Sequence, residues 1–276
     1  MGDSFQVDII SAFPLSGMLS GLWLRDQSPL YPTSVRPSVT VMTIIEPNVS
    51  LATLVTTRPD LAPALETLGL DYCCGGGRSL AEACSAAGLK PDEVIAQLAE
   101  QPILDTADWV SMNPLELVDH LESVHHTYLT EALVRLSTLM ERVLDVHGAN
   151  HPELAEVAAV LSDLRADLEP HLMKEEQILF PMIRDLFGAD ETPAFHCGTL
   201  QNPITVMGIE HDRAGALLAR LRTLTSVYTP PGDACASYES LYAGLAELEA
   251  DTHLHIHKEN NILFPAAVAE EMTRSA

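Results

Sequence analysis

The sequence is short of positive charge. Its 276 residues hold 15 Lys and Arg against 39 Asp and Glu, which gives a formal net charge of −24. Nucleic acids and anionic membranes both bind through clustered cations, so neither is an expected partner. A metal site or a basic protein partner is compatible with this charge.

Long apolar runs are also missing. The most apolar early stretch, residues 5–24, is interrupted by Asp8 and Pro14 and has no basic leader, so we predict neither a transmembrane span nor a signal peptide. Strand patterns are absent, whereas 47% apolar residues supply ample material for a core. The five cysteines form no extracellular framework, which favours a reducing cytoplasm.

The first 44 residues differ from the rest of the chain. They show no helical or strand period and contain four prolines, namely Pro14, Pro29, Pro32 and Pro37. We therefore predict that residues 1–44 form a flexible arm. The alternative is that translation begins at Met42.

Residues 45–103 are predicted to form a small helical module. Ser79 and Glu82 have the spacing of a capping box, and Pro91 opens a further helix. A short linker follows, and residues 112–272 are long helices separated by proline-containing loops. Their pattern indicates an all-α fold, an antiparallel four-helix bundle. The expected helices are 114–146, 152–187, 203–228 and 235–271.

An internal repeat lies in the second and fourth of these helices. The eleven residues from His171 to Pro181 match those from His255 to Pro265 at seven positions, 84 residues apart. Two further histidines, His126 and His211, are 85 residues apart on the other two helices. A repeat of this length predicts two copies of one helical hairpin.

The repeat places metal-binding side chains at helical spacing. His171 and Glu175 are four residues apart, as are His255 and Glu259, so each pair shares one face of its helix. Four imidazoles and two carboxylates converging in a bundle core suit two iron ions. The alternative, surface histidines beside salt-bridging glutamates, is disfavoured because the whole pattern is repeated. Ferritin-type bundles use Glu-x-x-His pairs, of which we identify one here.

Several neighbouring residues are less clearly assigned. Helical period does not decide between His125 and His126, whereas the repeat offset favours His126. Asp167 and Asp251 lie four residues before a repeated histidine and are candidates to orient the imidazoles. Glu210 is a candidate to line the metal pocket or a route to it. The histidines without a matching partner are expected at the surface or in loops: His120, His147, His151, His196, His253 and His257.

A cysteine turn precedes the bundle. Cys73 and Cys74 are followed by Gly75, Gly76 and Gly77, and three glycines readily adopt positive φ in a tight turn. Adjacent cysteines are expected to point apart and to chelate one metal poorly. A thiol or redox role, or a metal shared with a partner, is the functional interpretation. A purely structural turn is the alternative.

These features together resemble the iron–sulfur cluster repair di-iron proteins, the ScdA type also called Repair of Iron Centers. The resemblance rests on Asp71-Tyr72-Cys73-Cys74-Gly75-Gly76 followed by two His-x-x-x-Glu-x-x-x-Leu-Phe-Pro segments, and covers residues 45–270. It implies a hemerythrin-like bundle with an oxo-bridged, non-haem di-iron centre. Its implied ligands are His126, His171, Glu175, His211, His255 and Glu259.

The resemblance also implies a cytoplasmic protein that repairs iron–sulfur clusters damaged by nitrosative or oxidative stress, by donating iron. Damaged iron–sulfur proteins would be its partners, and small gases such as nitric oxide or oxygen its ligands. Nitric oxide reduction and gas binding or sensing are the alternative functions. A homodimer is the assembly we consider beside a monomer.

Overall fold

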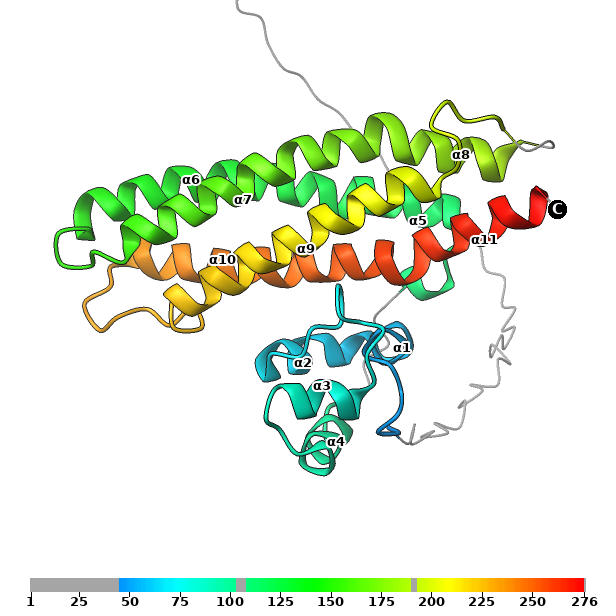
Figure 1. Ribbon diagram of the computed structural model, residues 1–276. Coiled ribbons are helices and arrows are strands. Elements are labelled where there is room, and N and C mark those ends of the chain that lie inside the picture. The colour runs from blue at the N-terminus through cyan, green and yellow to red at the C-terminus, as the bar shows by residue number, and fades with distance from the viewer. Residues whose placement is uncertain (1–44, 103–107, 190–192, 276) are drawn as a thin grey trace, which may run out of the picture. The chain divides into compact units, whose positions relative to one another are not determined.

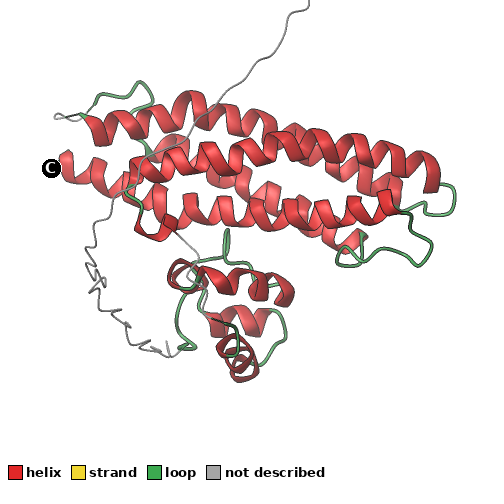
Figure 2. Cartoon of the chain, turned by 180° about the vertical axis from the view of Figure 1, so that it is seen from behind, coloured by secondary structure: helices red, strands yellow, loops and turns green. Residues whose placement is uncertain are grey.

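The computed structural model describes residues 45–102, 108–189 and 193–275. These residues form helices and connecting loops, with no β-strand beyond two isolated bridges (Figure 2). The predicted all-α fold is therefore confirmed. The predicted arm, residues 1–44, lies outside the described residues, as does part of the predicted linker. Among the described helices none is long and apolar enough to cross a membrane.

Four short helices make up the module. They are α1 (Leu51–Thr57), α2 (Ala62–Leu68), α3 (Leu80–Ala86) and α4 (Pro91–Ala99), with a 3-10 turn at Pro59–Leu61 before α2. The predicted capping box is present: Ser79 accepts a hydrogen bond from the Glu82 amide, and Glu82 accepts one from the Ser79 amide. The module's apolar core contains leucines of all four helices together with Ile256, which belongs to the bundle.

The bundle contains four long, mostly helical segments that lie side by side (Figure 1). A 3-10 turn, Asp108–Ser111, precedes the first. The four segments comprise α5 (Pro114–His120), η3 (Leu121–His126) and α6 (Thr127–His147); α7 (Leu154–Lys174), η4 (Glu175–Leu179) and α8 (Phe180–Gly188); α9 (Gln201–Leu224); and α10 (Ala236–Lys258), η5 (Glu259–Leu263) and α11 (Phe264–Arg274). Leucines from all four segments fill the bundle core.

The third long helix ends earlier than the sequence pattern predicts. It stops at Leu224, because Ser226, Val227 and Tyr228 adopt φ values of 50°, 58° and 54° in the left-handed region. The Thr225 hydroxyl accepts a hydrogen bond from the Tyr228 amide at 3.0 Å and stabilises this turn. The predicted continuation to residue 228 is therefore wrong, since a local side-chain bond replaces the helical ladder.

Three of the four segments contain a π-helical turn that the sequence pattern does not predict. These turns are η3, η4 and η5. In η4 and η5 the closing bonds run from Phe180 N to Glu175 O and from Phe264 N to Glu259 O, five residues back. A proline follows each phenylalanine and has no amide hydrogen to continue the ladder. Single π turns of this kind are frequent at functional sites.

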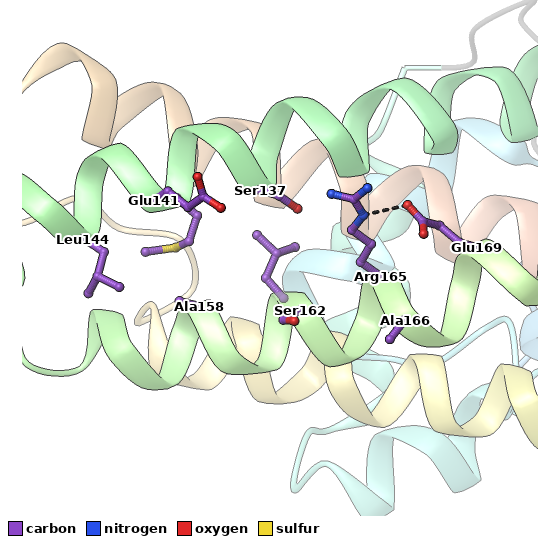
Figure 3. A pocket seen from close by; sticks show the side chains of 10 residues that line it. Ser137, Glu141, Leu144, Ala158, Ser162, Arg165, Ala166 and Glu169 are labelled. Atoms are coloured by element: carbon purple, nitrogen blue, oxygen red, sulfur yellow. Dashed lines mark hydrogen bonds and ion pairs between the residues drawn. The ribbon is translucent and has the colours of Figure 1, made fainter.

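A surface pocket of about 400 Å³ lies between α6 and α7 (Figure 3). Ser137 and Glu141 of α6 face Ser162 of α7 across it, and Arg165 binds Glu169 at its edge. It is lined by no histidine or cysteine and by none of the predicted iron ligands.

The close packing of α6 and α10 is testable at Gly244. A Cβ built there would lie 2.6 Å from Cδ2 of Leu136, a fully buried side chain. Gly244→Ala is expected to lower the free energy of unfolding by about 1–3 kcal/mol through overpacking. Gly208→Ala in α9 is the control, because nothing lies within 4 Å of its Cβ. Urea unfolding of both variants makes the comparison, and equal effects would contradict the close packing.

Candidate metal centre

The six predicted ligands converge in the bundle interior. Their side chains form two overlapping groups, His126–Glu175–His255–Glu259 and His171–Glu175–His211–Glu259. Within each group one ligand atom per residue lies within 4.8 Å of all the others. All six residues are buried, and both glutamates have no exposed surface. The two groups thus share both carboxylates, one from each copy of the repeat.

The imidazoles of each group face each other through Nε2. The Nε2 atoms of His126 and His255 are 3.2 Å apart, and those of His171 and His211 are 3.1 Å apart. Glu175 Oε2 lies 3.5 Å from His126 Nε2 and 3.3 Å from His171 Nε2, so this carboxylate reaches both groups. Glu259 does the same.

Glu259 Oε1 lies 3.0 Å from His255 Nε2, and Glu259 Oε2 lies 3.2 Å from His211 Nε2. Each carboxylate therefore spans the two groups with one imidazole of each. Side chains in this arrangement are suited to bridge two metal ions, with each pair of histidines binding one ion.

The electrostatics of the centre also fit cations. Burial and the neighbouring Glu259 hold the pKa of Glu175 well above its usual range. Burial opposes ionisation of Glu259 as well, but His255 and His211 outweigh it and hold the pKa of Glu259 well below its usual range. Neither oxygen of Glu175 accepts a hydrogen bond from a described residue. Two buried carboxylates with so few donors are costly unless a metal ion binds them.

Two of these histidines are in the neutral form that metal binding requires. Burial lowers the pKa of His171 and His255 to about 4, so both imidazoles are neutral at neutral pH. In three of the four ligand histidines the Nδ1 hydrogen is donated to a neighbouring helix, which leaves the Nε2 lone pair facing the centre. The bonds are His126 to Glu176, His171 to Glu210 and His211 to Asn260, each 2.9 Å.

Two predicted orienting residues have other partners. Asp167 binds Arg213 at 2.6 Å, and Asp251 accepts from His125 Nδ1 at 2.9 Å. The expectation that they orient His171 and His255 is wrong. Because His171 turns Nε2 inward, its Nδ1 faces α9 and not the preceding turn of its own helix, and His255 Nδ1 has no hydrogen-bond partner among the described residues. Glu210 takes this role for His171 instead.

His125 is buried beside His126 but has both ring nitrogens occupied. Its Nδ1 binds Asp251, and its Nε2 accepts a hydrogen bond from Lys258 Nζ at 2.6 Å. The Lys258 ammonium also donates to His120 Nε2 at 2.9 Å and lies 5.0 Å from the centre of the Trp109 ring. Lys258 is 2% exposed. The sequence analysis did not single out this buried cation. The available signal was that both copies of the repeat carry a lysine directly before the glutamate.

Two histidines expected at the surface lie elsewhere. His257 is fully buried, and its Nδ1 lies 3.3 Å from the Tyr72 carbonyl oxygen. His253 binds Glu66 at 2.8 Å and is only partly exposed. Both positions face the helical module, so they are covered by residues distant in sequence. His196 is exposed as predicted.

The cysteine turn is organised by Asp71. Its carboxylate accepts hydrogen bonds from the amides of Cys73, Cys74 and Gly75 at 2.8–3.1 Å. The two Sγ atoms are only 3.8 Å apart, and the Asp71 carboxylate joins them in a third group of metal-ligating atoms. The expectation that the thiols point apart is therefore wrong, because the aspartate folds both amides around one carboxylate.

The glycines act here through close approach. None of Gly75, Gly76 and Gly77 has a positive φ, contrary to the sequence expectation. A Cβ at Gly76 would lie 2.4 Å from the Tyr72 carbonyl oxygen, so this position has no room for a side chain. The hydrogen bond that the Cys73 thiol donates to Cys74, together with burial, holds the pKa of the Cys73 thiol well above its usual range.

The turn is also joined to the metal centre. Asn261 donates to the Cys73 carbonyl at 3.0 Å, while its neighbour Asn260 accepts from ligand His211. Both cysteines line an open groove together with Asn260 and Asp212. The π turn η5 thus contacts the candidate metal centre through Asn260 and the cysteine turn through the next residue, Asn261.

Comparisons with known proteins agree with this geometry. Residues 117–267 match the Hemerythrin HHE cation binding domain, and residues 47–101 match a domain of unknown function, DUF542, also called ScdA_N. The fold and centre thus define a hemerythrin-type cation-binding protein.

The matching relatives narrow this class. A probable iron–sulfur cluster repair protein of Haemophilus influenzae is 36% identical over 225 residues, 80% of this chain and 97% of that protein. The iron–sulfur cluster repair proteins YtfE of an Enterobacter species and of Escherichia coli O81 are each 38% identical, with the same coverage. The chain therefore belongs to the family of iron–sulfur cluster repair proteins.

The tight fit of the cysteine turn is testable at two adjacent glycines. Gly76→Ala is expected to displace the turn, because its Cβ would overlap the Tyr72 carbonyl. The buried Cys73 thiol should then react faster with an alkylating reagent. Gly77→Ala is the matched control, since nothing lies within 4 Å of its Cβ. Equal alkylation rates in the two variants would contradict the close approach.

Proposed function

We propose that this protein holds two non-haem iron ions in its bundle and repairs iron–sulfur clusters damaged by nitrosative or oxidative stress, by donating iron. The observation that carries the proposal is the pair of buried His₂ groups that share Glu175 and Glu259. The names of the relatives, 36–38% identical over most of the chain, support the same activity.

Each residue has a defined part in this proposal. His126 and His255 would hold one iron, His171 and His211 would hold the other, and both ions would share Glu175 and Glu259. Bound iron supplies the metal that a damaged cluster has lost. The imidazoles would hold it through their Nε2 atoms, which face each other within each pair.

Cys73 and Cys74 are proposed to handle the iron outside the bundle. Their Sγ atoms and the Asp71 carboxylate are close enough to bind one metal ion. Iron binding would displace the thiol protons, which the raised pKa of Cys73 otherwise retains at neutral pH. In this division of roles the bundle, residues 112–272, stores iron and the module, residues 45–103, delivers it.

Damaged iron–sulfur proteins are the proposed partners. All five cysteines are free, as a reducing cytoplasm would keep them, and we place the protein there. The names of the relatives favour repair over nitric oxide reduction or gas sensing. Binding of nitric oxide or oxygen and a homodimeric assembly stay predictions from the sequence.

The metal centre is tested by iron content. Protein purified without oxygen is expected to contain two irons per chain, measured by elemental analysis. The Glu175→Ala, Glu259→Ala double variant should lose most of this iron, because both bridging carboxylates are gone. Glu141→Ala, on the outer surface of α6, is the control and should keep both irons. Iron retained by the double variant would place the metal elsewhere.

The cysteine role is tested by a repair assay. Iron-loaded protein is expected to reactivate a [4Fe–4S] enzyme damaged by nitric oxide better than the same amount of free ferrous iron. Cys73→Ser with Cys74→Ser should keep the bundle iron and reactivate more slowly. A double variant that repairs at the parental rate would remove the thiols from the mechanism. Recovery no better than with free iron would contradict donation itself.

A further inference from the structure

The four ligand histidines are not equally supported. His126, His171 and His211 each donate Nδ1–H to a side-chain oxygen at 2.9 Å. His255 is fully buried, and its Nδ1 has no hydrogen-bond partner among the described residues. When Nε2 of a neutral imidazole binds a metal, Nδ1 carries the hydrogen, so His255 would bury an unpaired donor. A buried donor without a partner destabilises the state that contains it.

The two copies of the repeat explain this difference. Glu210 directly precedes ligand His211, and its carboxylate binds both His171 Nδ1 and Lys174 Nζ. His125 occupies the matching place before ligand His126 in the other hairpin. The same position of the repeat is therefore a carboxylate, Glu210, in one copy and an imidazole, His125, in the other.

His125 keeps the lysine contact but not the histidine contact. Its Nε2 binds Lys258, which occupies the same position of the repeat as Lys174. Its ring stacks on His255, with centroids 5.6 Å apart and planes 19° apart, and its Nδ1 is directed to Asp251. A stacked ring offers no acceptor to the edge of His255. The substitution of imidazole for carboxylate thus removes the partner of His255 Nδ1.

Charge acts in the same direction. Lys174 is partly exposed and paired with a carboxylate, whereas Lys258 is 2% exposed and donates to two imidazoles, those of His120 and His125. A buried ammonium without a carboxylate hydrogen-bonded to it disfavours a second cation nearby. The group formed by His126 and His255 therefore binds a metal with one unsupported ligand and beside a buried positive charge.

We propose that the two iron positions are unequal and that the iron held by His126 and His255 is the one released first. The cause is His125, which stands where the other hairpin has Glu210. This inference rests on the proposed function and names which of its two irons is delivered. His125 acts as a positioning residue, through His255, and does not bind the metal.

The test measures iron release. Protein loaded anaerobically with two ferrous ions is mixed with a ferrous chelator, and iron transfer is followed by absorbance. The parent is expected to release iron in two phases, one iron per chain in each. His125→Glu places a carboxylate between Lys258 and His255, as Glu210 lies between Lys174 and His171. It should slow the fast phase about 10- to 100-fold, the usual range for such partners.

Two further variants complete the design. Glu210→Gln removes the carboxylate from the other hairpin and should accelerate the slow phase while leaving the fast phase unchanged. His125→Gln offers an uncharged acceptor and should slow the fast phase to a smaller extent than His125→Glu. It also serves if the glutamate variant folds poorly, which thermal unfolding of the iron-loaded proteins will show.

The possible failures are distinguishable. A single release rate for both irons of the parent would overturn the inference while leaving the proposed di-iron function intact. A fast phase that neither His125 variant slows would overturn it too, as would equal slowing of both phases. A parent that binds fewer than two irons would contradict the proposed function itself.

Discussion

Two carboxylates with no exposed surface lie at the centre of this bundle, and much of the surrounding structure serves to accommodate them. Glu175 and Glu259 each reach both groups of imidazoles, whereas neither oxygen of Glu175 accepts a hydrogen bond from a described residue. A buried carboxylate is costly to keep ionised unless a compensating cation lies beside it. The arrangement of the four long segments is therefore linked to metal binding, since these segments carry the histidines that would complete the coordination.

The π turns place these carboxylates. Glu175 and Glu259 are the first residues of η4 and η5, and each turn is closed by a bond to the carbonyl of that glutamate. The residue after each glutamate binds a ligand histidine on another helix, Glu176 for His126 and Asn260 for His211. One local irregularity thus positions a candidate bridging carboxylate and orients a candidate histidine ligand together, and the repeat does so twice.

The module adds chemistry that the bundle lacks. Its cysteines are brought together by Asp71 and contacted by Asn261, directly beside the residue that orients His211. The sulfur atoms outside the bundle and the nitrogen and oxygen atoms inside it are candidate metal ligands of different softness. Such a difference would suit the proposed transfer of iron from the bundle to a damaged protein, and the unequal support of His255 would suit the proposed release of one iron before the other.

The sequence by itself determined the all-α fold, the duplicated hairpin and the family. Helical spacing brings His171 to Glu175 and His255 to Glu259 within one turn, so these neighbours follow from local geometry alone. The repeat offset also identified His126 as the residue facing the centre, where helical period left His125 equally plausible. The capping box at Ser79 is local in the same sense.

Only the tertiary structure decided which side chains support the ligands. The partners of Nδ1 come from other helices, so Glu210 and not Asp167 binds His171. The burial of His257 depends on a module almost 200 residues away in sequence. The close thiols of Cys73 and Cys74 depend on a turn folded around one carboxylate. Contacts between distant segments leave no periodic signal in a single sequence, because each partner is chosen by packing.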